Sequence, residues 1–297
     1  LAMDWEELAT IGIEFGIVYN NAMLPDQLDE KRLGQRSGWA WGLGYAGGLV
    51  ALLIALFAFV HTDTPLFGLD NSSTEQQHIR AVGPLVCIWF LLFVWPLFVF
   101  TPDRPSTKIG AAEAVRLGLK TVRQTLAELP RYKNLARFLV ARMIYADGLA
   151  TVFAIGGTYA AGVFGMRFTQ VIYFGLLLNI TAGIGAACFA WGDDWSGSKK
   201  TILISIVGLA ASALLAVLAT EVTLFWIAGA ALGVFVGPAQ SASRSMMARL
   251  APREMMTEFF GLYALTGKAT AFLGPIIVAV VTDATDNQRS GMVVILA

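Results

Sequence analysis

The chain has 297 residues, of which 56% are hydrophobic and only 14% are charged, and its 21 basic and 21 acidic side chains cancel to a net charge of zero. Soluble domains carry about 25% charged residues, so this composition and the mean hydropathy of +0.64 exclude an ordinary soluble domain. They predict an all-α polytopic membrane protein.

A membrane-spanning helix needs about 20 mostly apolar residues. Such spans are predicted at 5–24, 39–61, 80–101, 136–163, 168–191, 201–220, 222–243 and 256–282, and another begins near 289. Because the chain begins with Leu1 rather than Met and stops inside an apolar run, we expect a fragment, incomplete at both ends. Cys87 and Cys188 lie inside spans and are interpreted as small buried hydrophobic residues.

Lys and Arg predict the orientation of the chain, because these residues are retained on the cytoplasmic side of a membrane. Most of them lie in alternate links between the spans, namely 25–38, 102–137, 192–200 and 244–255. The intervening links carry few. We therefore expect the first span to enter from outside, residues 102–134 and 192–200 to lie in the cytoplasm, and residues 62–79 to lie outside.

The long link 102–134 is predicted to contain a basic amphipathic helix. Its apolar and basic residues form two neighbouring stripes at helical spacing: Val115, Leu119, Val122, Leu126 and Leu129, and Arg116, Lys120 and Arg123. This helix is expected either to lie on the inner membrane surface or to pack on the protein. The link divides the chain into a front part, 1–101, with three spans, and a back part, 135–297, with five spans and the start of a sixth.

A weak internal repeat relates residues 23–48 to residues 249–274. Each segment has a Leu and a Pro near the end of a span, then a charged link, then a Gly-rich helix, and Tyr45 matches Lys268. Parallel repeats on either side of a long central link are typical of transporters built from two halves.

The loop AWGDDWSGSKK, residues 190–200, is similar to the loop signature G-x-x-x-D-R-x-G-R/K-R/K of the major facilitators. Asp194, Gly197 and Lys199 match the pattern, and Lys200 extends its basic run. In such a loop, Gly permits a tight turn, Asp offers a carboxylate to a neighbouring helix end, and the basic pair holds the loop inside. The alternative is a solvated turn.

Six strings of the sequence strongly resemble the vacuole-effluxer-like branch of the major facilitators: IVYNNAMLPDQL, SGWAWGLGYAGGL, RMIYADGLATVFAIGGTYAAGVFGM, NITAGIGA, GVFVGPAQSASRSMMARLAP and TEFFGLYALTGKATAFLGP. The resemblance covers nearly the whole chain. It implies the major facilitator fold, two parallel-repeat helix bundles, with the spans as about helices 4 to 11 of twelve. Eukaryotic members of this branch release amino acids from the vacuole, so the resemblance implies an efflux-type amino-acid transporter.

Polar groups inside a bilayer are costly and are functional candidates by default. In the span 136–163, Arg142, Tyr145 and Asp147 are candidates for substrate binding or coupling, although Arg142 has the alternative of extending to the interface. Lys268 lies deep in the span 256–282 at a depth close to that of Asp147, and the two are expected to come within reach. Three roles stay open for Lys268: a structural ion pair, an anchor for a substrate carboxylate, or a charge whose pairing changes during transport.

Weaker candidates are Glu14, Asn20, Asn179 and Gln240. A hydrogen bond between helices is an equal alternative for Asn179. The same holds for Glu14, whose carboxylate is otherwise suited to proton coupling. Gln240 follows Gly237 and Pro238, which we expect to bend or break their helix.

The sequence thus predicts a secondary active transporter of small polar solutes that works by alternating access in a bacterial inner membrane, with protons as a candidate coupling ion. The alternatives are a proton-coupled transporter of drugs or sugars, and a membrane protein with a structural or receptor role. HExxH, GxSxG and GxxxxGK[ST] motifs are absent from the sequence, so neither an enzyme nor a nucleotide-driven pump is expected. We expect no metal, cofactor or nucleic acid as a partner.

Overall fold

The structure is a computed structural model that describes residues 5–27, 29–60, 77–101 and 109–296. Its contacts divide the chain into two compact units, one formed by Leu1–Leu43 and Val115–Ala297, and the other by Gly44–Ala114. The predicted domain boundaries at residues 101 and 134 stay a prediction. The predicted outer loop at 62–79 falls mostly outside the described residues.

Every regular element of the described residues is a helix. The α-helices are α1 (Trp5–Gln27), α2 (Leu33–Ala55), α3 (Gln77–Arg80), α4 (Val82–Phe100), α5 (Ala111–Glu128), α6 (Lys133–Phe164), α7 (Phe168–Ser196), α8 (Ser198–Leu218), α9 (Val222–Leu250), α10 (Met256–Thr266), α11 (Leu273–Thr285) and α12 (Gln288–Val293). The all-α class predicted from composition is confirmed.

Six helices of the described residues are long and apolar enough to cross a membrane: Leu33–Phe59, Val82–Phe100, Lys133–Phe164, Phe168–Ser196, Ser198–Leu218 and Val222–Leu250. They overlap six of the predicted spans and confirm a polytopic membrane protein. The first predicted span, 5–24, is helical as α1 but is not among these six. The last predicted segment, near 289, forms the short α12 and a 3₁₀ turn.

The predicted span 256–282 is two helices rather than one. Between α10 and α11 the chain turns at residues 267–272, where amides bond back over three residues, such as Lys268 N to Leu265 O at 3.0 Å and Leu273 N to Thr270 O at 2.7 Å. Pro275 accounts for the restart, because a proline is tolerated only in the first turn of a helix. The apolar composition of the segment did not reveal this interruption.

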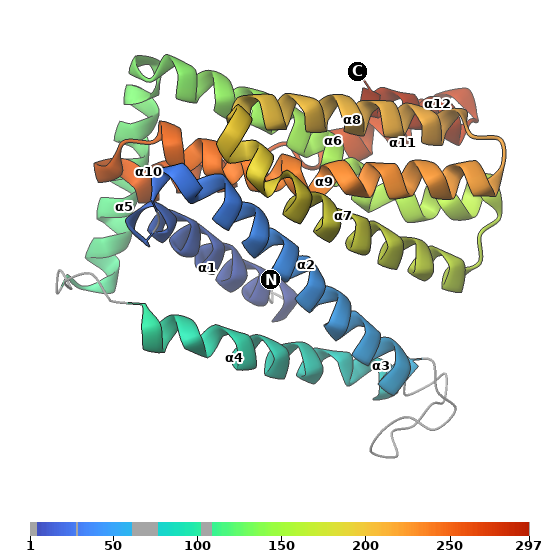
Figure 1. The fold of residues 1–297 in the computed structure, drawn as a ribbon, viewed down its shortest axis with the longest axis horizontal. Helices are drawn as coiled ribbons and strands as arrows, with labels where there is room; N and C mark the ends of the chain where they lie inside the picture. The colour runs from blue at the N-terminus through green and yellow to red at the C-terminus, as the bar shows by residue number, and fades with distance from the viewer. Residues whose placement is uncertain (1–4, 28, 61–76, 102–108, 297) are drawn as a thin grey trace. The chain divides into compact units, whose positions relative to one another are not determined.

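In the first unit, α6, α7, α8 and α9 run side by side, and α5 runs crosswise to them at one end (Figure 1). Glycines bring α9 against α7: a Cβ added at Gly237 would meet the Ala182 carbonyl, and one added at Gly233 would meet Thr181. Small residues allow such close approach of membrane helices. The expected break at Gly237 and Pro238 does not occur, because α9 is one continuous helix through Pro238.

Two hydrophobic clusters lie toward opposite ends of this unit. One joins Leu33 and Leu135 to Met247 and Phe259, and therefore the start of α2 to α6, α9 and α10. The other joins α6, α7 and α9 through Tyr159, Phe174 and Phe225, and reaches α12. The first cluster therefore holds the start of α2 at one end of the unit.

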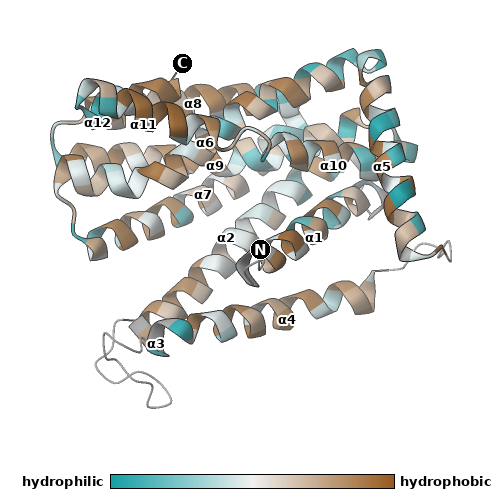
Figure 2. Ribbon diagram, turned by 180° about the vertical axis from the view of Figure 1, so that it is seen from behind, coloured by the Kyte–Doolittle hydropathy of each residue, from teal (hydrophilic) through white to brown (hydrophobic). Residues whose placement is uncertain are grey.

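The amphipathic helix α5 leaves its apolar stripe open within this structure. Val115, Leu119, Val122 and Leu126 are 40% to 69% exposed, so contacts among the described residues do not cover them. Hydrophobic residues predominate along α8 and α11, whereas hydrophilic residues gather on α5 (Figure 2).

The second unit contains the second half of α2, a π-helical turn at Leu56–Val60, α3 and α4. No residue of α4 is buried, as expected of a lipid-facing helix. Both cysteines are exposed as well, so the prediction that they are buried is wrong. Each lies on an exposed face of an apolar helix.

Candidate functional site

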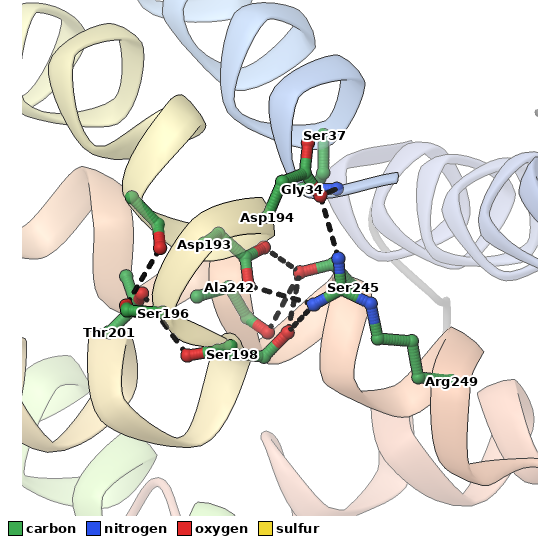
Figure 3. A network of polar contacts seen from close by, with 12 residues as sticks. Gly34, Ser37, Asp193, Asp194, Ser196, Ser198, Thr201, Ala242, Ser245 and Arg249 are labelled. Atoms are coloured by element: carbon green, nitrogen blue, oxygen red, sulfur yellow. Dashed lines mark hydrogen bonds and ion pairs between the residues drawn. The ribbon is translucent and has the colours of Figure 1, made fainter. Parts of the chain in front are cut away.

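A polar cluster joins the first turn of α2 to the last turns of α7 and α9 (Figure 3). Asp194, on α7, accepts hydrogen bonds from the backbone amides of Gly34 at 2.7 Å and Gln35 at 2.8 Å. These amides lie at the start of α2, where the first N–H groups of a helix have no partner within it and the helix dipole favours a negative charge. The signature aspartate thus binds the end of a neighbouring helix.

Arg249 of α9 connects the two acidic residues of α7. Its guanidinium lies 3.0 Å from Asp193 Oδ1 and 2.7 Å from Asp194 Oδ1. It also donates to Ser198 Oγ, and Ser245 Oγ donates to Asp193 Oδ2. Asp193 is therefore buried but fully paired, as a buried charge requires.

Arg244, one turn before Arg249, reaches α2 and α1. It donates to Ser37 Oγ at 2.9 Å, to Ser37 O at 2.8 Å, and to Asn21 Oδ1 at 3.5 Å. Ser37 Oγ in turn donates to Ser241 O at 2.8 Å. We call the residues of these three paragraphs the α2 cluster: Asn21, Gly34, Gln35, Ser37, Asp193, Asp194, Ser198, Ser241, Arg244, Ser245 and Arg249.

Next to the α2 cluster, glycines of α2 touch α7 directly. A Cβ added at Gly38 would lie 2.6 Å from Ala190 Cβ and 2.7 Å from Ala186 O, and one at Gly42 would lie 3.5 Å from Ala187 Cβ. The α2–α7 contact is therefore a glycine-mediated helix pair. Three predicted cytoplasmic links, 25–38, 192–200 and 244–255, meet at this place.

A cavity of about 180 Å³ lies deeper, between α6, α9 and α10, and is lined by Arg142, Tyr145, Leu149, Gln240, Tyr263 and Gly267. Counted from the helix ends beside the α2 cluster, the polar residues lie roughly 11–18 Å along their helices, at 1.5 Å per residue. That is about half of a 30 Å hydrocarbon core. Three sequence-predicted candidates, Arg142, Tyr145 and Gln240, therefore share one mid-depth site.

The break between α10 and α11 positions Arg142. The guanidinium donates to Tyr263 O at 2.6 Å and to Thr266 Oγ1 at 3.2 Å, and it lies 3.6 Å from the centre of the Tyr263 ring. A cation is favourable at the carbonyl end of a helix, here α10. Arg142 therefore turns into the protein rather than toward the membrane surface. Beside it, the hydroxyl of Tyr145 is hydrogen-bonded to Ser243 Oγ.

Lys268 and Asp147 have separate partners in this structure. Lys268 Nζ lies 2.9 Å from Glu14 Oε1, with the two side chains 64% and 33% exposed. Asp147 Oδ1 accepts from Gly274 N at 3.3 Å, at the start of α11. The expected Asp147–Lys268 pair is therefore absent here, and Glu14 takes the place of Asp147.

The remaining candidates are more peripheral. Asn179 donates to Gly175 O within its own helix at 3.0 Å and lines a separate apolar cavity of about 250 Å³. Asn20 is exposed on α1, whereas its neighbour Asn21 enters the α2 cluster. Gly197 has a positive φ of 88° at the turn between α7 and α8. The basic pair of the signature, residues 199 and 200, is exposed.

Sequence reasoning missed Asp193, Arg249, Tyr263 and Gly267. Asp193 had one available signal, since two adjacent acidic residues at the end of an apolar span need cationic partners. Arg249 lies in the basic link 244–255, whose charges indicate orientation alone. Tyr263 and Gly267 carry no signal of their own, because their role follows from a helix break that the composition does not show.

Comparison with known proteins places the chain in a family. The family model described as Vacuole effluxer Atg22 like matches residues 20–297. The uncharacterized MFS-type transporter YxiO of Bacillus subtilis (strain 168) is 26% identical over 289 residues, which cover 96% of this chain and 65% of the relative. Autophagy-related protein 22 of Yarrowia lipolytica is 24% identical over 289 residues, which cover 88% and 47%.

A third relative, Autophagy-related protein 22 of Cryptococcus neoformans var. neoformans serotype D, is 25% identical over 279 residues, which cover 86% of this chain and 46% of the relative. The chain thus spans about two thirds of the Bacillus relative and about half of the fungal ones. The family match covers most of the chain, and the helices agree with it. The chain therefore belongs to the family Vacuole effluxer Atg22 like and is an all-α polytopic membrane protein of the major facilitator type.

Proposed function

We propose that the protein is a secondary active transporter that moves small polar solutes, with amino acids as the substrate class, by alternating access. The observation that carries this proposal is the arrangement of the α2 cluster and the mid-depth cavity. The cluster joins α1 and α2 to the ends of α7 and α9 at a single level of the membrane. The polar cavity lies farther in, at the depth where transporters of this type bind their substrates.

The contacts of the α2 cluster suit a closure that forms and breaks. They include hydrogen bonds and ion pairs between separate helices, and Arg249 remains partly exposed at its side chain. In alternating access, one half of the transporter moves against the other around a fixed site. The cluster would close the predicted cytoplasmic entrance while the cavity opens to the other side.

Amino acids suit the charges around the cavity. A zwitterion offers a carboxylate to a cation and an ammonium to an anion. Arg142 lines the cavity, and Asp147 lies five residues farther along the same helix. The family description names an effluxer, which supports outward movement of a solute. Lys268 is paired with Glu14 at 2.9 Å, which supports a second role for this pair as a contact that changes during transport.

We place the protein in a bacterial inner membrane, with the links 102–134 and 192–200 in the cytoplasm. The distribution of Lys and Arg supports this orientation. The surrounding bilayer and the solute are the proposed partners.

Uptake into vesicles tests the function. The purified protein is reconstituted into proteoliposomes, and uptake of labelled amino acids, sugars and lipophilic cations is measured with and without a proton gradient. We expect saturable uptake of at least one amino acid above that of empty vesicles. Uptake of only sugars or only lipophilic cations would contradict the substrate class, and binding without any flux would favour a receptor role.

A further inference from the structure

We propose that Arg142 binds the carboxylate of the transported solute, and that the helix break at Gly267 holds the guanidinium in place for it. This inference rests on the proposed function and adds the group that recognises the substrate. Lys268 was one candidate for the carboxylate anchor on sequence grounds. The structure favours Arg142 of α6 for this role.

The contacts of Arg142 with the described residues include no acidic group. Within the part of the chain that the structure describes, its guanidinium contacts a carbonyl, a hydroxyl and an aromatic ring, and none of these carries a formal charge. A guanidinium has five N–H donors in a planar fork that matches a carboxylate. A charged group at this depth is expensive to keep, and a solute carboxylate in the adjacent cavity would supply the missing counter-charge.

Gly267 makes room for this cation. A Cβ added at Gly267 would lie 2.7 Å from Arg142 Nη1 and 2.9 Å from Nη2, so only glycine allows the guanidinium this position against the backbone. The same turn ends α10, and the Tyr263 carbonyl near it accepts from Arg142 and from Thr266 Oγ1. The break and the arginine thus form one unit, and Arg142 lines the cavity with Tyr145 and Gln240.

Lys268 is less suited to the same task. Its ammonium is paired with Glu14 and its side chain is 64% exposed, so a solute carboxylate would have to displace an existing partner. Arg142 lines the cavity itself, whose volume of about 180 Å³ suits a small metabolite rather than a drug-sized ligand.

A comparison of amino acids with their carboxamides tests the proposal, because the carboxamide keeps the size of the group but has no negative charge and one acceptor oxygen fewer. L-alanine, L-leucine and L-lysine and their carboxamides compete for uptake of the labelled amino acid in proteoliposomes. We expect the wild type to prefer the acid over the amide by about tenfold or more, the range of a charge-assisted hydrogen bond. In Arg142→Gln this ratio should fall to about one, whereas Arg142→Lys should keep an intermediate ratio.

Gly267→Ala provides a second variant that leaves the arginine in the chain. It should lower the acid-to-amide ratio by displacing the guanidinium, and Arg137→Gln, an exposed arginine of the same helix, should leave it unchanged. Thermal unfolding confirms that each variant is folded. If Arg142→Lys and Gly267→Ala are folded and keep the wild-type ratio, the proposal is overturned while amino-acid transport stands. If the wild type transports no amino acid, both the proposed substrate class and this inference fail.

Discussion

Replacing Asp194 with Asn should open the α2 cluster. The substitution keeps the size of the side chain but removes its charge, and it directs an amide group at donors on α2 and Arg249. Asp194 accepts two backbone hydrogen bonds and one guanidinium contact at 2.7–2.8 Å. Hydrogen bonds to charged groups contribute about 1.5–3 kcal/mol each, and Asn retains part of them, so we expect a loss on the order of 3 kcal/mol. At about 1.4 kcal/mol per factor of ten, the closed-to-open ratio should fall roughly a hundredfold.

Distances between spin labels measure this ratio. Labels on cysteines introduced at the exposed positions Arg36 and Lys199 lie on either side of the α2–α7 contact, in a background where Cys87 and Cys188 are serine. The wild type should give mainly the shorter distance, and Asp194→Asn should shift the population to a longer one. Asp283→Asn makes the same chemical change at an exposed position of α11 and should have no effect. An unchanged distance distribution in a folded Asp194→Asn protein would refute the reasoning.

Three further predictions concern other parts of the structure. Gly38→Ala should weaken the α2–α7 contact by about 1–3 kcal/mol through overpacking, and the short spin-label distance should be lost. Gly192→Ala, where an added Cβ would meet open space, should keep the short distance. Glu14→Gln and Lys268→Gln should each lower the unfolding temperature, because each leaves one charge of the pair without its partner. The double variant should be no less stable than either single one, and a clearly less stable double variant would exclude a simple pair. Leu119→Trp on α5 should be quenched by brominated lipids if the apolar stripe lies in the membrane interface, and an unquenched tryptophan would favour packing on protein.

Hydropathy was sufficient to predict the helical class and the position of most spans, because burial in lipid selects long apolar runs whatever their packing. The link between Asp194 and a helix end also follows from chemistry, since a carboxylate beside an apolar span must find donors. The identity of that helix, α2, does not follow, because residues 160 positions apart meet only through the tertiary fold.

The Asp147–Lys268 hypothesis shows the limit of counting along helices. Depth was measured at 1.5 Å per residue, which assumes one straight helix through 256–282. The turn at 267–272 redirects the backbone at Lys268, so the lysine meets Glu14 on α1 and the carboxylate of Asp147 meets Gly274 N. The same break brings Arg142 into the cavity, a position that no sequence spacing indicates.

The most direct test of the account is a reversible covalent bond across the α2–α7 contact. A Cβ built at Gly42 lies 3.5 Å from Ala187 Cβ, at the lower end of the roughly 3.5–4.5 Å separation found in disulfides. In the background with both native cysteines replaced, Gly42→Cys with Ala187→Cys should therefore form a disulfide on oxidation. The account predicts that oxidation stops amino-acid flux in proteoliposomes and that a reducing agent restores it, with each single-cysteine variant insensitive to both treatments. Undiminished flux through fully cross-linked protein would show that this contact does not open during transport, and would contradict alternating access through the α2 cluster.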